Sequence, residues 1–353
     1  MQSGKALIAM SGGVDSSVAA YLTMQAGLSC IGATMRLYEP DGEACLQQVA
    51  DARSVADRLG IPFHVFDFKD QFRCQVMDAF VRAYECGATP NPCVECNRYL
   101  KFGHFLTAAQ QLGCDYIVTG HYARIAQHPE TGRYMLRKAS DESKDQSYFL
   151  YALEQEQLAH IRFPLGELTK TAAREIAEAQ NFTTARKKDS QDICFIPDGD
   201  YPTFMQRYTG QTYPEGNFLD LAGKVVGKHK GAYAYTLGQR KGLGIAMGAP
   251  VYVCGKDMAA NTVTVGPQEA LMHTTLLAND WYWQMLDGID APLRVTAKTR
   301  SRMQEQPATV YPDENGLIKV VFDQPQRAIT PGQAVVLYQD DCLVGGGTIR
   351  NVI

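Results

Sequence analysis

Residues 6 to about 122 alternate short apolar runs with amphipathic stretches. The apolar runs predict strands, and the stretches whose apolar residues recur every three or four positions predict helices. Gly27, Gly60 and Pro62 provide stop signals between them. The predicted elements are strand 6–10, helix 16–25, strand 29–37, helix 44–59, strand 62–68, helix 72–84, helix 98–112 and strand 115–119. This alternation predicts an α/β fold with a doubly wound parallel sheet.

The alternation ends after Arg124. A hairpin is expected near residues 133–137 and helical segments from 145 to about 180. Beyond about residue 205, glycine and proline become frequent and the predicted strands are short. Residues 251–265 predict two strands, and residues 308–322 predict a hairpin that turns at Asn315-Gly316. The last third of the chain is therefore mainly β.

The chain length favours several domains over one. With 353 residues and 45% hydrophobic composition, the chain is too long for a single ordinary core. Its apolar runs are too short to span a bilayer, and we expect a cytoplasmic protein without membrane contact. The expected domains are an α/β domain with a helical segment at residues 1–205, a small β domain at 206–275 and a C-terminal β-barrel at 276–353.

Cysteine content and charge narrow the class of protein. The ten cysteines are scattered over a large chain, which favours reduced thiols over a disulfide framework. A formal charge of −4 does not indicate a general nucleic-acid-binding surface. Basic clusters do occur, one of them at residues 186–188, although each by itself is typical of ordinary solvated surface.

A glycine-rich segment joins the first predicted strand to the first predicted helix. Residues 10–17 read Met-Ser-Gly-Gly-Val-Asp-Ser-Ser and lie at the carboxyl edge of the sheet, where such folds bind ligands. Glycines permit close backbone approach, and the free N–H groups of a helix start favour an anion. A glycine turn with a helix cap is the structural alternative. Position and composition favour a phosphate site, although the segment matches neither the Walker loop nor the dinucleotide-binding pattern.

Several motifs carry a resemblance to a known family. The glycine segment resembles the Ser-Gly-Gly-x-Asp-Ser loop of the PP-loop ATP pyrophosphatases, which adenylate a substrate oxygen while splitting ATP to AMP and pyrophosphate. Further motifs resemble, in the same order, those of the tRNA-specific 2-thiouridylases, which replace oxygen 2 of the wobble uridine (position 34) with sulfur. These motifs are residues 89–97, 119–122, 144–148, 188–196, 236–244 and 330–333. The resemblance implies a HUP-like PP-loop domain and an ATP-dependent tRNA-uridine 2-sulfurtransferase.

The resemblance also implies a route for the sulfur. Adenylation turns the uracil oxygen into departing AMP, and a cysteine persulfide supplies a sulfur that is more acidic and more nucleophilic than a thiol. Cys194 would carry the persulfide and Cys96 would be its partner thiol. Attack by Cys96 leaves a disulfide between the two, which a reductant must reset. A buried structural thiol is the alternative for Cys194, which its surrounding motif disfavours.

Cys93 departs from the pattern of the family. Many members have aspartate at this position, where it is assigned as a general base or orienting group, whereas a thiolate would have to accept the proton here. Cys93, Cys96 and Cys194 could instead bind an iron–sulfur cluster through three ligands and leave one iron open to sulfide. Zinc would need a fourth ligand, such as His104 or His121. Cluster-free persulfide chemistry and a functional cluster both stay open.

Contacts to ATP and tRNA follow from the same resemblance. The implied ATP contacts are Ala9, Met10, Ser11, Gly12, Gly13, Val14, Asp15, Ser16, Met35 and Gly120. Asp15 is expected to organise Mg²⁺ or the loop, and Met35 to pack on adenine or simply in the core. The implied tRNA contacts are His121, Lys144, Asp145, Gln146, Arg300, Ser301 and Gln333. His121 and Tyr122 would face the extruded base.

Three hypotheses compete at this point. The first is a 2-thiolase for the anticodon arm of Lys, Glu and Gln tRNAs, with a persulfide donor protein as a second partner. A PP-loop synthetase of a small metabolite explains the glycine loop but leaves the thiols and the C-terminal β region without a task. A sulfur or iron–sulfur carrier without ATP turnover predicts damage between Ser11 and Ser16, where the sequence is intact. We expect the first.

Overall fold

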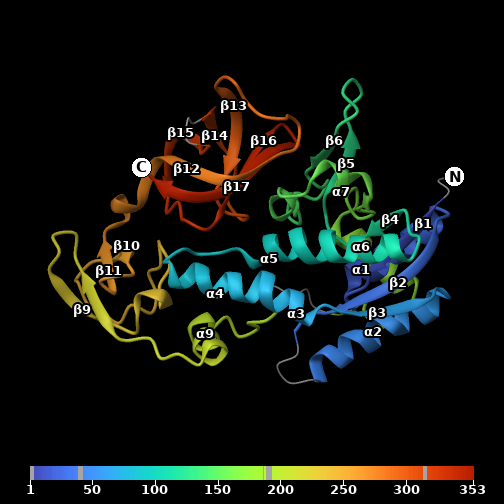
Figure 1. Cartoon of the computed structure of the whole chain (residues 1–353), viewed down its shortest axis with the longest axis horizontal. Helices are drawn as coiled ribbons and strands as arrows, with labels where there is room; N and C mark the ends of the chain where they lie inside the picture. The colour runs from blue at the N-terminus through green and yellow to red at the C-terminus, as the bar shows by residue number, and fades with distance from the viewer. Residues whose placement is uncertain (1–3, 39–42, 186, 188–192, 313–315) are drawn as a thin grey trace.

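The computed structural model describes residues 4–38, 43–185, 187, 193–312 and 316–353. An α/β domain lies at one end of the long axis, a small β domain at the other, and a β-barrel between them and above (Figure 1). The predicted fold class, a doubly wound parallel sheet followed by β domains, is confirmed. Within the described residues, no helix has the length and apolar character needed to cross a membrane.

The α/β domain is built on a five-stranded parallel sheet with the order β3-β2-β1-β4-β7. Its strands are β1 (Lys5–Ala9), β2 (Ser29–Arg36), β3 (Phe63–Asp67), β4 (Tyr116–Val118) and β7 (Ile161–Arg162). In the centre, Leu7 of β1 lies level with Ile31 of β2 and Ile117 of β4. These three side chains are almost fully buried, as expected for strands covered on both faces.

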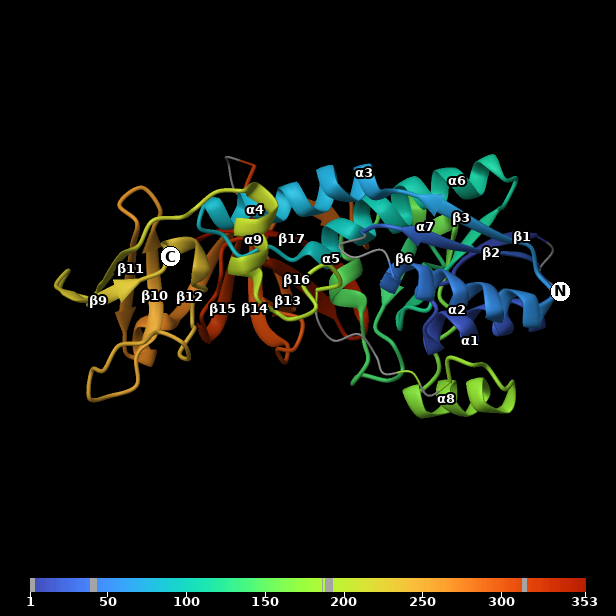
Figure 2. The same cartoon turned by 90° about the horizontal axis from the view of Figure 1, so that it is seen from below.

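Two groups of helices cover the two faces of the sheet. On one face, α1 (Val14–Gln25), α2 (Glu43–Leu59) and α8 (Lys170–Ala179) pack around Ile8, with α8 lying against α1 (Figure 2). On the other face, α6 (Phe105–Gln111) and α7 (Gln155–Ala159) pack around Leu7. Alternate residues of β1 thus serve opposite cores, which is the basis of the doubly wound arrangement.

Two long helical segments extend from the sheet toward the other domains (Figure 1). The first comprises α3 (Lys69–Phe72), the π-helix η1 (Arg73–Met77) and α4 (Asp78–Glu85). The second comprises α5 (Pro92–Glu95), the π-helix η2 (Cys96–His104) and α6. The second segment begins at Pro92, earlier than the predicted residue 98. Proline is favoured at the first position of a helix because the amide hydrogen that it lacks has no helical partner there.

Shorter helices complete the α-helical parts of the chain. They are α9 (Tyr201–Thr209) and the 3₁₀ turns η3 (Ser147–Leu150), η4 (Ala232–Ala234) and η5 (Gln268–Leu271). A second core, separate from the sheet, lies between the two long segments and α9, and contains Phe72, Phe80 and Phe204. This core reaches the segment that carries one of the candidate site residues, as described below.

The remaining strands form the two β domains. A four-stranded sheet has the order β10-β11-β8-β9, with β8 (Gly216–Leu219), β9 (Val225–His229), β10 (Tyr252–Asp257) and β11 (Thr262–Gly266). Six strands close into a barrel through a pairing of β12 with β17: β12 (Met272–Trp283), β13 (Leu293–Lys298), β14 (Gln306–Pro312), β15 (Ile318–Arg327), β16 (Ala334–Gln339) and β17 (Cys342–Val352). The predicted pair of strands at 251–265 and the hairpin at 308–322 are both present. Asn315, expected in the hairpin turn, lies outside the described residues.

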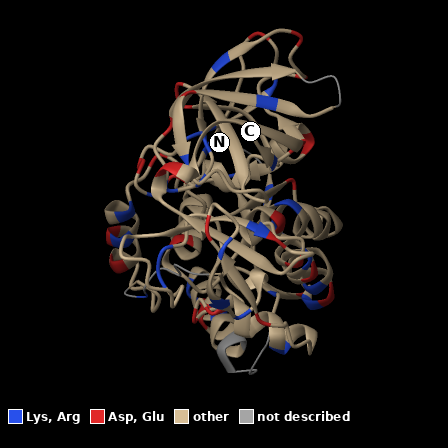
Figure 3. Ribbon diagram, turned by 90° about the vertical axis from the view of Figure 1, so that its left-hand side faces the viewer, with Lys and Arg blue, Asp and Glu red and all other residues tan. Residues whose placement is uncertain are grey.

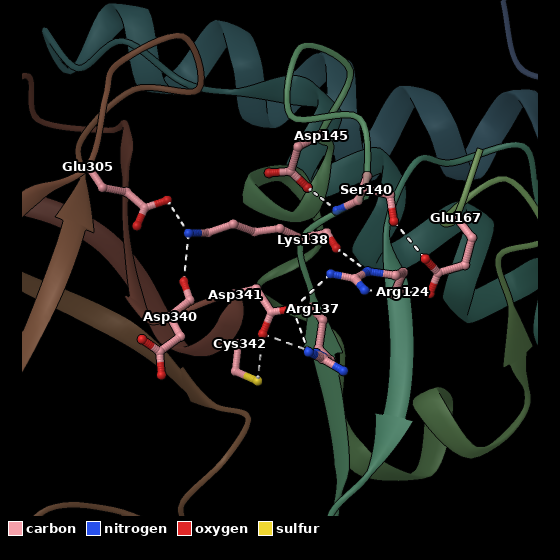
Figure 4. A network of polar contacts seen from close by, with 11 residues as sticks. Arg124, Arg137, Lys138, Ser140, Asp145, Glu167, Glu305, Asp340, Asp341 and Cys342 are labelled. Atoms are coloured by element: carbon pink, nitrogen blue, oxygen red, sulfur yellow. Dashed lines mark hydrogen bonds and ion pairs between the residues drawn. The ribbon is translucent and has the colours of Figure 1, made fainter. Parts of the chain in front are cut away.

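The hairpin expected near residues 133–137 joins two domains. It consists of β5 (Arg124–Gln127) and β6 (Tyr134–Arg137), and β6 pairs with β17 of the barrel at Cys342. Arg124 and Arg137 each donate an Nη2 hydrogen bond to Oδ2 of Asp341, at 2.7 and 2.6 Å (Figure 4). The α/β domain and the barrel therefore share both a sheet and a charge network.

The carboxylate of Asp341 is stabilised by this network. Partial burial by itself would raise the pKa of Asp341, but the hydrogen bonds and charges of Arg137 and Arg124 hold it below the usual value. Such a group stabilises the fold above its pKa in the unfolded chain, 3.8, and loses that contribution as the pH falls through the lower folded value. The junction should thus be strongest at neutral pH.

Replacing Asp341→Asn should destabilise the junction by about 1–2 kcal/mol, because two arginines lose their charged acceptor. Calorimetric unfolding at pH 7 should show a lower transition temperature in the variant. The difference between variant and parent should shrink as the pH falls below 3.8.

Asp323→Asn provides the matched control. Asp323 also accepts two hydrogen bonds from one arginine, Arg294, but the pair lies within the barrel with side chains 59% and 45% exposed. Solvent screening makes such pairs weak. An equal loss of stability in both variants would mean that Asp341 has no special role at the domain junction.

Candidate active site

The glycine loop lies between the end of β1 and the start of α1. Gly13 is the N-cap residue of α1, and no side chain caps the helix there. Gly12 has a φ of 69°, and a Cβ atom at this position would lie 2.8 Å from the backbone oxygen of Gln48. Glycine is thus required at residue 12, and the uncapped N–H groups of a twelve-residue helix face the loop.

The hydroxyl groups of the loop hold its shape. Ser16 Oγ donates to the carbonyl of Gly13 at 3.0 Å and accepts from the amide of Ser11 at 3.2 Å. Ser16 is buried, whereas Ser11 is exposed and its hydroxyl can reach a ligand. The flanking residues expected at this site, Ala9, Met10 and Val14, are half-buried or buried next to the loop.

Asp15 forms an ion pair that the sequence did not reveal. Lys170 of α8 lies with Nζ at 2.7 and 2.8 Å from the two carboxylate oxygens of Asp15. The hydroxyl of Tyr122 donates to the same carboxylate at 2.9 Å. Lys170 is 9% exposed, so Asp15 is held by a nearly buried cation. Both predicted roles of Asp15, in organising the loop and in binding Mg²⁺, stay predictions.

A second lysine contacts the loop. Lys187 Nζ donates to the carbonyl of Gly12 at 3.2 Å and to Asp51 of α2 at 2.8 Å. The hydrogen bond from Lys187 is the main cause of the lowered pKa of Asp51. The basic cluster at 186–188 was the only sequence signal for this contact, and it did not indicate the loop.

The two other predicted ATP contacts lie at strand ends near the loop. Gly120 follows β4, and a Cβ atom there would lie 2.7 Å from the backbone carbon of Asp15 and 2.8 Å from the amide of Ser16. Only glycine therefore lets this segment approach the loop. Met35 lies at the end of β2, half-buried against the core around Leu7.

The three candidate thiols gather at the start of the second helical segment. Cys93 lies on α5, and Cys96 begins η2 and is 8% exposed. Cys194 lies in a turn just before Phe195, whose buried ring packs edge-on against Phe72 and Phe80, with centroids 5.6 and 5.4 Å away. This aromatic core fixes the residue next to Cys194. Residues 188–192 of the same motif lie outside the described part of the chain.

The ionisation of the three thiols is coupled. Cys93 and Cys194 are exposed at the surface, whereas Cys96 is buried. The protein atoms around Cys194 still displace water, and this desolvation is the largest cause that raises its pKa to about 12, while the negative charges that Cys96 and Cys93 would carry raise it further. Desolvation likewise raises the pKa of Cys93 and of Cys96. The nearby charge of Lys101 opposes the rise at all three. At neutral pH these groups are thiols, and the charge of one disfavours ionisation of the next.

A metal centre does not fit the residues that surround the thiols. Among the described residues, no group of three or more His, Cys, Asp and Glu side chains could hold a metal ion. Each of the two histidines considered as a fourth ligand has one ring nitrogen in a hydrogen bond. His104 Nε2 lies 3.2 Å from Gln75 Oε1, and His121 Nδ1 lies 2.7 Å from Thr119 Oγ1. We therefore derive no chemistry through an iron–sulfur cluster or zinc.

His121 lies between two aromatic rings at the same edge of the sheet. Its imidazole contacts Phe102 and Phe163, with ring centroids 5.7 and 5.8 Å away. Burial, with a smaller contribution from the charge of Lys101, holds the pKa of His121 well below its ordinary value. The imidazole is therefore neutral at physiological pH. Tyr122, its predicted companion, is 2% exposed and is used to bind Asp15.

Most of the predicted tRNA contacts hold parts of the protein together. Asp145 accepts hydrogen bonds from the amides of Ala139 and Ser147 at 3.0 and 3.2 Å, and Gln146 Oε1 accepts from the amide of Tyr122 at 2.9 Å. Lys144 and Ser301 are half-buried beside turns. Whether any of these residues also contacts tRNA stays a prediction.

The predicted tRNA contacts of the barrel lie at domain junctions. Arg300 Nη2 donates to the carbonyls of Leu237 and Ala328 at 3.3 and 3.1 Å, which links the small β domain to the barrel. Gln333 Nε2 donates to the carbonyl of Thr89 at 2.9 Å, and the amide of Thr89 donates to Pro331 at 2.8 Å. These bonds attach the barrel to the segment that leads into Cys93.

The charges of the described residues are mixed in space. Figure 3, a view along the long axis, shows Lys and Arg positions interspersed with Asp and Glu positions along the ribbon. This distribution matches the small net charge of −4. Recognition of a polyanion would therefore rest on particular basic residues rather than on a uniform basic surface.

Comparisons with known proteins cover the whole chain. Family models match residues 4–198 (tRNA methyl transferase HUP domain), 202–267 (tRNA methyl transferase PRC-barrel domain) and 273–349 (aminomethyltransferase beta-barrel domain). A tRNA-specific 2-thiouridylase MnmA from Clostridioides difficile is 47% identical over 98% of this chain and 98% of its own. One from Moorella thermoacetica is 48% identical over 98% of this chain and 99% of its own.

A solved structure of a 4-thiouridine synthetase with RNA and ATP also aligns with part of the chain. It covers 58% of this chain and 50% of its own, with 16% identity and a TM-score of 0.36. Similarity at this level carries no argument about function.

The ion pair between Asp15 and Lys170 gives a test of the loop architecture. Lys170→Met should reduce stability by about 1–3 kcal/mol, because the carboxylate of Asp15 loses its nearly buried cation. Asp15→Asn should be destabilising for the same reason. In the double variant, the combined loss should be clearly smaller than the sum of the two single losses.

Equilibrium denaturation of the parent and the three variants measures this coupling. Strictly additive losses would show that the two side chains do not stabilise one another. The pair Lys187 and Asp51 gives a comparison, because its lysine is 43% exposed and its coupling should be weaker.

Proposed function

The chain belongs to the family of tRNA-specific 2-thiouridylases, as its motifs predict, and on this premise we propose that it replaces oxygen 2 of the wobble uridine of tRNA with sulfur, at the expense of ATP. The observation that carries the proposal is the similarity to these enzymes over the full chain, combined with one site where Cys93, Cys96 and Cys194 influence one another's charge. Each feature has a task in the chemistry.

The glycine loop is the proposed site of the ATP phosphates. The uncapped N–H groups of α1 and the exposed hydroxyl of Ser11 are donors for phosphate oxygens. Lys170, which binds Asp15, and Lys187, which binds the carbonyl of Gly12, would neutralise charge that develops on the departing pyrophosphate. Mg²⁺ would balance further phosphate charge when ATP is bound, and Asp15 offers the carboxylate oxygen that such an ion prefers.

Adenylation precedes sulfur transfer in the proposed reaction. Oxygen 2 of the uracil attacks the α-phosphorus of ATP, pyrophosphate leaves, and the oxygen becomes part of an adenylate. The Cys96 thiolate then attacks Sγ of Cys194, which carries the persulfide, and the S–S bond of the persulfide breaks. The outer sulfur departs as hydrosulfide, attacks carbon 2 and expels AMP together with the original oxygen.

The thiols require a reset after each turnover. The outer sulfur of the persulfide gains two electrons, and the two cysteines lose them as they form the Cys96–Cys194 disulfide. A dithiol reductant restores both thiols, and a persulfide donor protein recharges Cys194. Desolvation by the surrounding protein raises the pKa of Cys194 although the residue is exposed, so a persulfide, being more acidic than a thiol, suits this position better than a free thiolate.

The substrate uridine must leave the anticodon stack to reach these sulfurs. His121 is 9% exposed and neutral, so the edge of its imidazole can contact a neutral base without an ionic cost. The proposed partners are the anticodon arms of Lys, Glu and Gln tRNAs. Lys144 and Arg300 are the candidate phosphate contacts.

The alternative of a small-metabolite synthetase leaves more of the chain unexplained. It uses the glycine loop but not the three thiols or the two β domains. Similarity to the 2-thiouridylases extends through both β domains, to residue 349 in the family model of the barrel. We therefore favour the tRNA thiolase.

Cys194→Ser should abolish thiolation of a tRNA anticodon stem-loop while ATP binding is retained, because the glycine loop is built from other residues. Single-turnover assays with a persulfide donor, read out by mass spectrometry of the RNA, measure the loss. Cys74→Ser, which removes an exposed cysteine outside the site, is the matched control and should retain activity. Normal thiolation by Cys194→Ser would exclude this residue as the sulfur carrier.

Ser11→Ala should show the converse defect, slower pyrophosphate release with normal persulfide loading of Cys194.

Removal of transition metals should not prevent the first turnover. Protein purified under chelation and assayed with ATP, added Mg²⁺ and a persulfide donor should thiolate tRNA once per active site, because the three thiols are proposed to act without a cluster. Iron, zinc and sulfide analysis of the same sample verifies the removal. Strict dependence on added iron would contradict cluster-free transfer.

A further inference from the structure

Arg98 joins the helical segment that carries Cys93 and Cys96 to the β-barrel. Its guanidinium donates two hydrogen bonds to the carboxylate of Asp280 on β12, from Nη1 to Oδ2 at 2.8 Å and from Nη2 to Oδ1 at 3.3 Å. The side chain of Arg98 is 22% exposed. A two-bond pair of this kind fixes the orientation of its partners as well as their distance. The chemistry above gives this pair no task.

Two aromatic rings also contact the guanidinium. Arg98 Cζ lies 4.8 Å from the ring centroid of Tyr99 on η2 and 4.8 Å from that of Tyr282 on β12. Tyr282 in turn packs edge-on against the buried ring of Tyr151, with centroids 6.3 Å apart. Contacts between a cation and an aromatic face add to the ion pair. Arg98 is therefore held by two side chains of the same barrel strand, Asp280 and Tyr282, and we call these three residues the Arg98 clamp.

A bulge in β12 places Asp280 in the clamp. The pairing of β12 with β17 shifts at this point, so that Asp280 and Trp281 together oppose Gly347. A Cβ atom at residue 347 would overlap the indole of Trp281, so glycine is required there. Asp280 has a φ of 48°, in the left-handed region that residues other than glycine rarely adopt. Bulges and such backbone conformations redirect side chains and are frequent next to functional sites.

The clamp lies two residues beyond Cys96 on the same π-helix. On the other side of Cys93, the chain is attached to the barrel a second time, where Gln333 donates to the carbonyl of Thr89 at 2.9 Å. Cys93 and Cys96 thus lie between two attachments to one barrel. Because a helix passes a displacement of one residue on to its neighbours, loss of the clamp would move Cys96.

We propose that Arg98 is a positioning residue of the thiol site: by holding η2 on Asp280 and Tyr282, it fixes Cys96 in the alignment that attack on the persulfide of Cys194 requires. Arg98 acts through the helix and takes no part in bond making. A displacement of about 1 Å can slow a reaction between aligned groups by roughly a hundredfold. The proposal rests on the sulfur-transfer activity proposed above and deepens it, since it gives the barrel a part in the sulfur step.

The first test separates adenylation from sulfur transfer. In single-turnover assays of the full-length protein with a tRNA anticodon stem-loop, ATP and glutathione persulfide, pyrophosphate release reports the first step and thiolated RNA the second. In Arg98→Met, thiolation at saturating RNA should be roughly tenfold slower or more. Pyrophosphate release and the RNA concentration that gives half the maximal rate should not change. A merely structural role would lower both steps together, and that result would overturn the proposal.

Further variants test whether the clamp is responsible. Asp280→Gly removes the carboxylate, tolerates a positive φ and should show the same defect, also if Arg98→Met does not fold. Combining the two should add little, because each removes the same pair. Arg98→Lys should recover part of the rate, since it keeps the charge but not the two-bond geometry. Arg294→Met is the matched control, because Arg294 binds Asp323 within the barrel at 2.8 and 2.9 Å, and should behave like the parent.

A second readout needs neither RNA nor ATP. Diamide oxidises neighbouring thiols, and the rate at which the Cys96–Cys194 disulfide forms, measured by mass spectrometry of the peptides, reports their alignment. This rate should fall roughly three- to tenfold in Arg98→Met, whereas alkylation of the exposed Cys74 should not change. Parent-like rates of thiolation and disulfide formation in Arg98→Met would overturn the proposal and leave the proposed function intact. Slower disulfide formation in Arg98→Met, with a parent protein that does not thiolate RNA, would retain the positioning role and remove the proposed function.

Discussion

The continuous helical segment from Pro92 to Gln111 determines where the chemistry can take place. Phe102 and Phe105 of this segment are fully buried in the core that covers the parallel sheet, and Leu100 is fully buried in the separate aromatic core. The end that carries Cys93 is attached to the barrel through Thr89 and Gln333. The two cores and the barrel thus hold this helical segment at three places. Its cysteines can shift only if the packing of the segment against the cores and the barrel also changes.

The same helical segment explains how two thiols that are distant in sequence, Cys96 and Cys194, come near one another. Cys194 is 98 residues beyond Cys96 in the numbering, yet the neighbouring Phe195 packs between Phe72 and Phe80 in the aromatic core under this helical segment. The hydrophobic effect thus positions Cys194, the proposed sulfur carrier, indirectly, through the residue beside it. The position of the glycine loop depends on a different core, that of the parallel sheet. The helical segment packs into both cores and so connects them.

Much of this architecture follows from local sequence. Alternating apolar runs predict the parallel sheet, and the glycine segment predicts a loop at its carboxyl edge. The start of the helical segment at Pro92 was not predicted, because a proline turn and a helix start look alike in sequence. Contacts between distant residues, such as Asp15 with Lys170, leave no local pattern at all. The π-helix is hidden for another reason, since the sequence carries no pattern that distinguishes its period from that of an α-helix.

Several side chains expected to meet RNA are already engaged inside the protein. Gln333 and Arg300 join domains, and Asp145 and Gln146 shape the loop beside Tyr122. An RNA that engaged their polar atoms would have to exchange these internal hydrogen bonds for new ones. Recognition at these positions would then be coupled to the relative placement of the domains.

The hairpin β5–β6 has a consequence for how such a protein can change over evolutionary time. Because the α/β domain contributes two strands to the sheet of the barrel, the border between the two units runs through a shared sheet rather than through a linker. A recombination event that joined this barrel to another enzyme would leave behind the strand that pairs with Cys342 and the two arginines that bind Asp341. The barrel is therefore inherited together with its hairpin, and the two are expected to diversify as one unit.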